Sequence, residues 1–380
     1  MDRIELNGRT YSLPRAPIAV ICADGCDPSY LEAGFAKGVL PALARCRDQG
    51  FYALAEAAMP TFTNPNNVSI VTGAPPSVHG ISGNFALDRA TGAEIMMTEP
   101  ELMRSDTILA LMSQAGVSVA AVTAKDKLRR LLGHKVRGIC FSSERADHCT
   151  VAEHGIDGVE AMVGRAAPDM YSADLSLSDY VQHGHAPDEA EALEFHQALD
   201  ARVGRLVELG CVVAVTADHG MNDKALPDGA PHLILAEDVL NARFGAGAVR
   251  VICPITDPFV RHHGALGAFV RVYRKRDDVP LDALSAALRE LPGVDLVLDR
   301  AAASDRWELP WDREADLVVT GDRNTVIGAS AAEHDLSALA GHRLRSHGGA
   351  GELGVPFLLS RPLTPEHAAI AGSRRLRNFD

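Results

Sequence analysis

The chain has 380 residues, of which 47% are hydrophobic and 23% are charged, a composition typical of a folded globular protein rather than a disordered one. Asp and Glu outnumber Lys and Arg by 50 to 37, and this net charge of −13 argues against nucleic acid or an anionic membrane as a partner. Because no apolar run is long enough to cross a bilayer, we expect no membrane-spanning segment.

Short apolar runs that end in polar residues mark the expected strands of a parallel sheet. Residues 17–23 form the first such run, which ends at Asp24, and a second strand expected at residues 52–58 leads to Thr63. An Asp at the carboxyl end of a buried strand can point into an active crevice. An ordinary strand-end Asp that begins a turn is the alternative.

The stretch at residues 59–73, MPTFTNPNNVSIVTG, places small polar side chains directly before an apolar segment. We expect Asn64 or Asn66 to cap the helix that follows, which puts Thr63 at the helix N-terminus, where the dipole favours an anion. A nucleophilic hydroxyl and its phosphoryl adduct suit that position, and a capped helix with spare hydroxyls is the alternative. The next segment, 73–85, is rich in Gly, Pro and Ser, and is expected to be a loop that carries Asn84.

Two pairs of polar residues follow later strands. Residues 117–122 predict a buried strand, after which Lys125 and Lys127 either project into the crevice mouth or form an ordinary solvated turn. Asp179 and His183 are four residues apart, which on a helical turn places both side chains on one face at metal-chelating distance.

The most strand-like run of the chain, residues 211–216, follows a long amphipathic helix expected at 189–209. This run leads to Asp218 and His219, which can both reach one ion where the chain turns after the strand. His347 lies in a Gly-rich loop near the C-terminus, and on its own it fits a solvated histidine equally well.

Residues 230–336 show a different pattern, with short expected strands around one clear helix at 281–291. This alternation favours a small α+β module inserted into the sheet domain, which we interpret as a cap over the crevice. We therefore expect an α/β protein with a mostly parallel central sheet flanked by helices. Its catalytic core would comprise residues 1–229 and 337–380, and its cap domain residues 230–336.

The polar residues at the ends of these segments include three carboxylates, three imidazoles and one hydroxyl. They are Asp24, Thr63, Asp179, His183, Asp218, His219 and His347. Because hard magnesium sites avoid imidazole, this set suits two divalent ions of the zinc type, and Mn²⁺ or Fe²⁺ could substitute. Two such ions can clamp the attacking and leaving oxygens of a phosphoryl transfer.

The order of these motifs resembles that of the alkaline phosphatase superfamily, and within it the nucleotide pyrophosphatase/phosphodiesterase branch, most closely the phosphonoacetate hydrolases. The resemblance spans nearly the whole chain. It implies an alkaline-phosphatase-like core in which one Zn²⁺ is held by Asp24, Thr63, Asp218 and His219. It implies that the other Zn²⁺ is held by Asp179, His183 and His347.

The resemblance also implies a substrate and a reaction. Thr63 would be the nucleophile, and Thr63 and Asn84 would hold the phosphonyl group, while Lys125 and Lys127 would hold the substrate carboxylate. The expected reaction is hydrolysis of the C–P bond of phosphonoacetate to acetate and phosphate through a phosphothreonine. The alternative is a phosphodiesterase, nucleotide pyrophosphatase or phosphomonoesterase on the same scaffold, for which both lysines would be dispensable.

The cellular context follows from weaker signals. Cys22, Cys211 and Cys253 sit in apolar strand-like runs, as buried reduced thiols do, and the charged N-terminus does not resemble a signal peptide, so we expect a cytoplasmic protein. A small phosphonate is the expected partner, and a homodimer is compatible with the sequence. His262 and His263 in the cap have no role assigned by the sequence.

Overall fold

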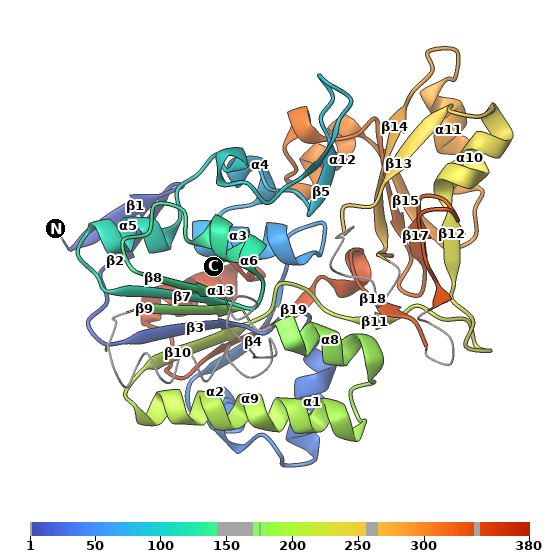
Figure 1. Ribbon diagram of the computed structural model, residues 1–380. Coiled ribbons are helices and arrows are strands. Elements are labelled where there is room, and N and C mark those ends of the chain that lie inside the picture. The colour runs from blue at the N-terminus through green and yellow to red at the C-terminus, as the bar shows by residue number, and fades with distance from the viewer. Residues whose placement is uncertain (1, 143–169, 175, 256–264, 338–342) are drawn as a thin grey trace.

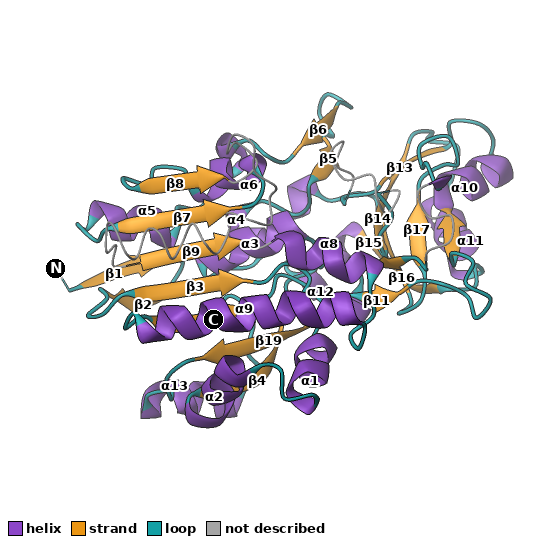
Figure 2. Cartoon of the chain, turned by 60° about the horizontal axis from the view of Figure 1, so that its bottom comes forward, coloured by secondary structure: helices purple, strands orange, loops and turns teal. Residues whose placement is uncertain are grey.

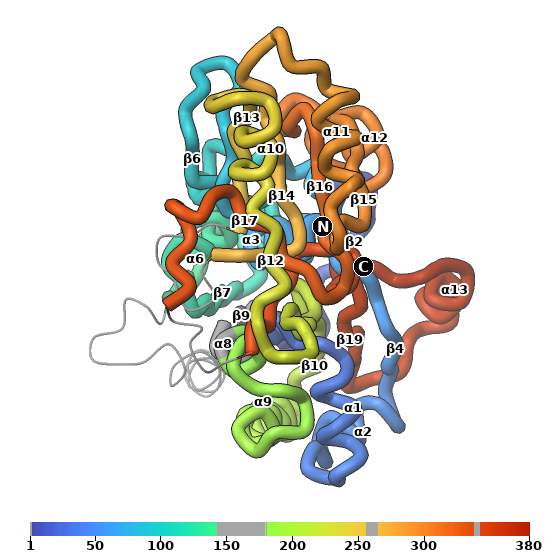
Figure 3. Tube along the Cα trace, turned by 90° about the vertical axis from the view of Figure 1, so that its right-hand side faces the viewer, coloured from blue at the N-terminus to red at the C-terminus, as the bar shows by residue number. Residues whose placement is uncertain are grey.

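The structure is a computed structural model that describes residues 2–142, 170–174, 176–255, 265–337 and 343–380 (Figure 1). Cap residues His262 and His263 lie outside these ranges. The described chain forms an α/β core with a second, smaller group of strands and helices beside it. Figure 3 shows this second group, which includes β13, β14 and α10, gathered above the core.

The core is built on a seven-stranded sheet in the order β4-β19-β10-β3-β9-β7-β8. Its strands are β3 (Ile18–Cys22), β4 (Phe51–Glu56), β7 (Val119–Thr123), β8 (Ile139–Ser142), β9 (Met170–Asp174), β10 (Val212–Thr216) and β19 (Gly354–Leu359). The five strands from β10 to β8 are parallel, whereas β19 runs antiparallel to both β10 and β4. The predicted mostly parallel sheet is therefore confirmed.

Helices cover both faces of this sheet (Figure 2). One face carries α1 (Pro28–Ala36), α2 (Pro41–Gln49) and α9 (Ala190–Glu208), and the other carries α3 (Thr63–Thr72), α5 (Ile108–Gln114) and α6 (Asp126–Leu132). Strand β7 shows why both faces are apolar: Ala120 and Val122 pack in the cluster that contains α9, while Val119 and Ala121 pack in the cluster that contains α5 and α6. Residues that alternate in this way bury a strand on both sides.

The smaller group is a four-stranded antiparallel sheet in the order β13-β14-β16-β15. Its elements are α10 (Ala236–Phe244), β13 (Val249–Ile252), β14 (Phe269–Arg274), α11 (Leu281–Arg289), β15 (Val294–Asp299), α12 (Arg300–Trp307) and β16 (Leu317–Gly321). The prediction of one helix here is wrong, since the described residues of this region form three. Helix α12 was missed because its sequence, RAAASDRW, lacks an apolar stripe; the Asp299 side chain caps it and Trp307 anchors it in the interior.

The hydrophobic interior of this second group continues into the core. Phe62 and Met59 of the core belong to the same buried cluster as Phe269 and Val318 of the antiparallel sheet. The antiparallel strands all fall between residues 230 and 336, but because the packing is continuous, these limits of the cap domain stay a prediction.

Short elements complete the described fold. They are β1 (Arg3–Leu6), β2 (Arg9–Ser12), α4 (Pro76–His79), β5 (Phe85–Leu87), β6 (Glu94–Met96), α8 (Ser176–Gly184), β11 (Asn222–Asp223), β12 (Leu233–Leu235), β17 (Val326–Gly328), β18 (Arg345–Ser346), α13 (Pro365–Ser373), and 3₁₀ turns at Pro100–Leu102, Trp311–Arg313 and Ala350–Glu352. Among the helices described, none combines the length and apolar character that spanning a membrane requires.

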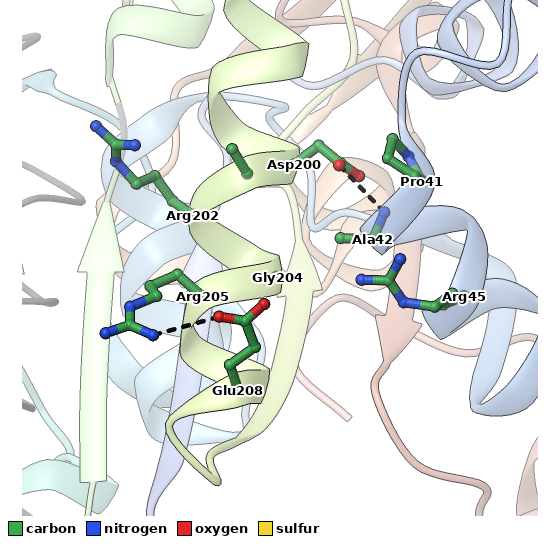
Figure 4. Close-up of a pocket in the computed structure, with 9 residues that line it drawn as sticks. Pro41, Ala42, Arg45, Asp200, Arg202, Gly204, Arg205 and Glu208 are labelled. Atoms are coloured by element: carbon green, nitrogen blue, oxygen red, sulfur yellow. Dashed lines mark hydrogen bonds and ion pairs between the residues drawn. The ribbon is translucent and has the colours of Figure 1, made fainter.

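A surface groove of about 530 Å³ lies where α2 and α9 pack together (Figure 4). Asp200 of α9 lines it, and its carboxylate accepts hydrogen bonds from the backbone N–H groups of Ala42 and Leu43 at 3.1 and 2.7 Å. Asp200 thereby caps α2, whose own N-cap residue, Leu40, has no side-chain acceptor. None of the predicted site residues lines this groove.

Candidate active site

The predicted site residues gather at one edge of the central sheet, and the topology explains why. Strands β9, β3 and β10 are adjacent and parallel, so their carboxyl ends meet at the same edge. Asp24 follows β3, Asp218 and His219 follow β10, and α8, which carries Asp179 and His183, begins just after β9. His347 follows the short strand β18 in a Gly-rich loop.

One part of the cluster surrounds Asp24. His219 Nε2 lies 3.2 Å from Asp24 Oδ1, and the Thr63 hydroxyl donates a long hydrogen bond of 3.5 Å to the same oxygen. His219 Nε2 is also 3.8 Å from Asp218 Oδ2. Asp24, Asp218 and His219 are fully buried, so these groups face one another without bulk water.

The other part surrounds Asp179. Its Oδ1 lies 3.3 Å from His183 Nε2 and 3.9 Å from His347 Nε2. The two parts touch, because the rings of His219 and His347 stack with their centroids 3.6 Å apart. Gly25 allows the backbone after β3 to lie close to Asp179. Its φ is +70°, and an added Cβ there would lie only 3.0 Å from Asp179 Oδ1.

Each imidazole is oriented by a backbone carbonyl. The Nδ1 atoms of His183, His219 and His347 lie 2.6, 3.0 and 2.7 Å from the carbonyl oxygens of Arg345, Gly220 and Thr61, respectively. A carbonyl can only accept, so Nδ1 carries a proton and Nε2 is the atom turned toward the carboxylates. Hydrogen bonds from Nδ1 to backbone carbonyls are the arrangement expected of histidines that ligate a metal through Nε2.

Burial and neighbouring charges shift the pKa values of three groups in this cluster. Burial lowers the pKa of His219, but the carboxylates of Asp218 and Asp24 outweigh burial and raise that pKa to about 10. Burial raises the pKa of Asp179, yet the neighbouring imidazoles of His183 and His347 hold it well below its usual value. Burial, reinforced by the imidazole of His219, lowers the pKa of His347 far below its usual value.

These groups fit a metal centre. Two sets of ligand atoms each lie within 4.8 Å of one another: Asp179 with His183 and His347, and Asp24 with Asp179 and His219. Within the described part of the chain, buried Oδ1 of Asp179 and Nε2 of His219 have no hydrogen bond of acceptable geometry, although burying such atoms normally requires a partner. Carboxylate oxygen and imidazole nitrogen are the donors that divalent metals of the zinc type accept.

Asp218 is arranged differently from its neighbours. Its Oδ1 accepts hydrogen bonds from the N–H groups of Gly25 and His219 at 2.9 and 3.1 Å, and its Oδ2 accepts one from the Asn67 amide at 3.2 Å. The second set of ligand atoms includes Asp179 and does not include Asp218. The structure brings the seven predicted ligand residues together in one cluster. How these residues divide between two ions stays a prediction.

Helix α3 begins at Thr63, as predicted, but the prediction of its cap is wrong. The N-cap residue is Phe62, which makes no side-chain cap, and Asn64 and Asn66 lie inside the first turn. Asn66 is instead used to fix the preceding bend: its amide donates to the carbonyls of Ala58, Pro60 and Phe62. The capping rule failed because Asn66 bonds backward to carbonyls and not forward to the helix.

Two of the predicted substrate residues, the lysines, follow the same edge of the sheet. Strand β7 is parallel to β9 and next to it, so Lys125, the N-cap residue of α6, and Lys127 in its first turn follow the same end of the sheet. Asn84 ends the predicted loop just before β5 and is buried. Its Oδ1 has no hydrogen-bond partner among the described residues.

Several supporting residues were missed from the sequence. Thr61 fixes the His347 loop, since its hydroxyl donates to Gly349 O and accepts from Gly348 N, at 3.0 and 2.9 Å. Glu352, in a fully buried ion pair with Lys224 at 2.8 Å, accepts a hydrogen bond from Gly349 N. Of these supporting residues, Asn67 is the one whose contact could have been predicted. It lies one helical turn after Thr63, and its side-chain amide donates a hydrogen bond to the Thr63 carbonyl.

Comparison with known proteins places the chain in a family. The profile of the type I phosphodiesterase / nucleotide pyrophosphatase family matches residues 18–349, which include every predicted site residue. The chain belongs to this family. The membership confirms the branch indicated by the motifs, and the match starts at β3 and ends just after His347.

Two phosphonoacetate hydrolases are among the individual proteins to which the chain is similar. The phosphonoacetate hydrolase of Sinorhizobium meliloti 1021, solved in complex with phosphonoformate and with phosphonoacetate, is 42% identical with a TM-score of 0.91, over 100% of this chain and 97% of that chain. A phosphonoacetate hydrolase of Penicillium oxalicum is 64% identical over 49 residues, 12% of this chain and 68% of the fungal sequence. The alkaline-phosphatase-like fold and the resemblance to phosphonoacetate hydrolases are thus confirmed.

A third relative is more distant. An uncharacterized pyrophosphatase/phosphodiesterase of Schizosaccharomyces pombe is 25% identical over 200 residues, which is 51% of this chain. The match covers 41% of the yeast protein, so this chain spans less than half of that relative's length.

Metal removal should test the cluster directly. We expect Zn²⁺ at 100 times its Kd to stabilise the chelator-treated protein by about 2.7 kcal/mol, because the ion binds only the folded arrangement of buried ligands. Differential scanning calorimetry before and after zinc addition measures this.

Asp179→Ala should abolish the response. His185→Ala should not, because the acidic cluster around His185, with Glu189 and Glu191, is largely exposed. An equal zinc response in Asp179→Ala would contradict the site.

Proposed function

We propose that this protein hydrolyses the C–P bond of phosphonoacetate, releasing acetate and phosphate. The observation that carries this proposal is the 42% identity, over the whole chain, to a phosphonoacetate hydrolase solved with its substrate. The buried cluster of carboxylates and imidazoles, with a hydroxyl beside it, supplies chemistry suited to the reaction.

The proposed cofactors are two Zn²⁺ ions, for which Mn²⁺ or Fe²⁺ could substitute. Seven residues would hold them, divided as the family resemblance implies. Asp24, Thr63, Asp218 and His219 would hold one ion, and Asp179, His183 and His347 the other. When bound, such ions lower the pKa of a nearby hydroxyl and offset the negative charge of the phosphonyl oxygens.

Thr63 is the proposed nucleophile. Its hydroxyl loses its proton to water and the oxygen attacks phosphorus in line, so that an O–P bond forms while the C–P bond breaks and the C–P electron pair leaves on the acetate carbon. That carbanion, stabilised as an enolate, takes a proton from water to give acetate. A water molecule then attacks the phosphothreonine and loses a proton, the O–P bond to Thr63 breaks, the Thr63 oxygen takes up a proton again, and phosphate leaves. At the N-terminus of α3 the helix dipole stabilises the added negative charge of the phosphothreonine.

Asn84, Lys125 and Lys127 are the proposed substrate-binding residues. Asn84 would hold the phosphonyl group together with Thr63, and the two ammonium groups would hold the substrate carboxylate. Breaking the C–P bond spreads negative charge onto that carboxylate in the transition state. Fixed ammonium groups therefore favour the transition state over the ground state and accelerate the reaction.

A second candidate function has an observation of its own. The family profile describes phosphodiesterases and nucleotide pyrophosphatases, and the yeast relative bears the same description. A diesterase or phosphomonoesterase would use the same metal cluster and Thr63, with its leaving group beneath the proposed cap. Such an enzyme has no carboxylate to bind, so it would not need the two lysines. A cytoplasmic location and a homodimer remain predictions.

The nucleophile assignment predicts that Thr63→Ala lowers turnover by more than about 1,000-fold, since the variant lacks the hydroxyl that forms the covalent intermediate. Zinc content, measured by elemental analysis, should stay largely intact because six carboxylate and imidazole ligands remain on other elements. Thr63→Ser keeps the hydroxyl and should retain part of the activity. Wild-type turnover in Thr63→Ala would rule out Thr63 as the nucleophile.

The lysine assignment predicts a change in substrate preference. Lys125→Ala or Lys127→Ala should lower kcat/KM for phosphonoacetate by about 10–100-fold, the effect of losing one hydrogen bond to a charged group. Turnover of bis(4-nitrophenyl) phosphate should change little. Lys135→Ala is the matched control, because Lys135 lies just beyond α6 in an exposed ion pair with Asp106. Equal losses on both substrates would instead indicate a general structural role for the lysines.

A further inference from the structure

A fully buried arginine connects the antiparallel sheet to the loop that carries Asn84. Arg271, on β14, forms a two-point ion pair with Glu314, with N–O distances of 2.6 and 2.8 Å, and neither side chain is exposed. The same guanidinium donates a 3.1 Å hydrogen bond to the carbonyl of Ser82. One arginine thus joins the second group of elements to the segment two residues before Asn84.

The Ser82–Asn84 segment is held closely on this side. The Asn84 N–H donates to the carbonyl of Pro254 at 2.7 Å. Between these two anchors lies Gly83, where an added Cβ would come within 2.8 Å of the Pro254 Cβ and 3.2 Å of Arg271 Nη1. The loop therefore lies against β14 with no room for a side chain, and its backbone position depends on Arg271 and Pro254.

Stability alone is a weak reason for such a pair. Two charges removed from water lose their hydration, and a well-packed apolar pair often supports folding equally well. One nitrogen of the Arg271 guanidinium, Nη1, also has no hydrogen-bond partner among the described residues. What an apolar pair could not provide is the directional hydrogen bond to the Ser82 carbonyl.

We propose that Arg271 is a positioning residue for Asn84: paired with Glu314, it holds the Ser82–Asn84 segment so that the Asn84 amide meets the phosphonyl group. This inference rests on the proposed function, in which Asn84 binds that group. We assign Arg271 no contact with substrate, because its side chain is fully buried and its hydrogen bonds go to Glu314 and Ser82.

The test compares zinc-loaded variants on phosphonoacetate. Arg271→Met alone would leave the Glu314 carboxylate buried and unpaired, so Arg271→Met/Glu314→Gln removes both charges together. We expect kcat/KM to fall by about 10–100-fold with the zinc content unchanged. The change in KM and the change in kcat should each match the change that Asn84→Ala causes. Gly83→Ala, which leaves the ion pair in place, should produce the same pattern by pushing the segment away from Pro254.

A double-mutant cycle distinguishes positioning from general damage. If Arg271 acts through Asn84, adding Arg271→Met/Glu314→Gln to Asn84→Ala should lower kcat/KM by less than about twofold further. Arg274→Met is the matched control: Arg274 lies on the same strand, but its partner Asp277 is fully exposed, so activity should be unchanged.

Any of three results would overturn the proposal. They are full activity in the folded pair variant, full activity in Gly83→Ala, and a full additional loss in the Asn84→Ala background. If the wild type cleaves bis(4-nitrophenyl) phosphate but not phosphonoacetate, the proposed function fails. The same cycle is then measured on the diester, whose phosphoryl group Asn84 would also contact, so the proposal about Arg271 is judged separately.

Discussion

The site depends on the burial of three carboxylates around one imidazole, that of His219. Asp24 and Asp218 are fully buried and Asp179 nearly so. Like charges in a medium of low dielectric repel strongly, and each also loses its hydration, so such a cluster requires compensating positive charge. The raised pKa of His219, which the nearby carboxylates cause, is the local sign of that requirement. Divalent cations meet it more fully than one imidazolium can.

The fold supplies this cluster at the carboxyl edge of three adjacent parallel strands. The β3 strand is central, and its neighbours β9 and β10 lead to the other two carboxylates, so the sheet itself sets the spacing of the ligands. Backbone carbonyls then fix all three imidazoles, which leaves the ligand atoms little freedom to move apart. A rigid, preorganised set of ligands is what both tight metal binding and fast chemistry require.

The sequence was most informative where a local pattern determines the structure. Asp24 and Asp218 were predicted because each follows a strand buried on both faces, and Thr63 because prolines and small polar residues mark a helix start. The cap of α3 was predicted wrongly because Asn66 has two possible hydrogen-bonding directions, and only the fold decides between them.

Contacts between distant segments could not be predicted in this way. Thr61 holds the ring of His347 across 286 residues, and Arg271 reaches Ser82 across 189. No periodicity or spacing in the sequence encodes such pairs, because they arise only when the sheet brings the segments together. The family resemblance was needed for Lys125 and Lys127, since two charged residues after a strand fit a solvated turn equally well.

The most direct test of the account is the product analysis of phosphonoacetate cleavage. The protein is stripped with chelator and restored with zinc, and acetate and phosphate are quantified alongside turnover of bis(4-nitrophenyl) phosphate. The account predicts zinc-dependent release of acetate and phosphate in equal amounts, with a higher kcat/KM for phosphonoacetate than for the diester. Rapid cleavage of the diester with no acetate formed would contradict it, and would make the protein a phosphodiesterase built on the same metal cluster.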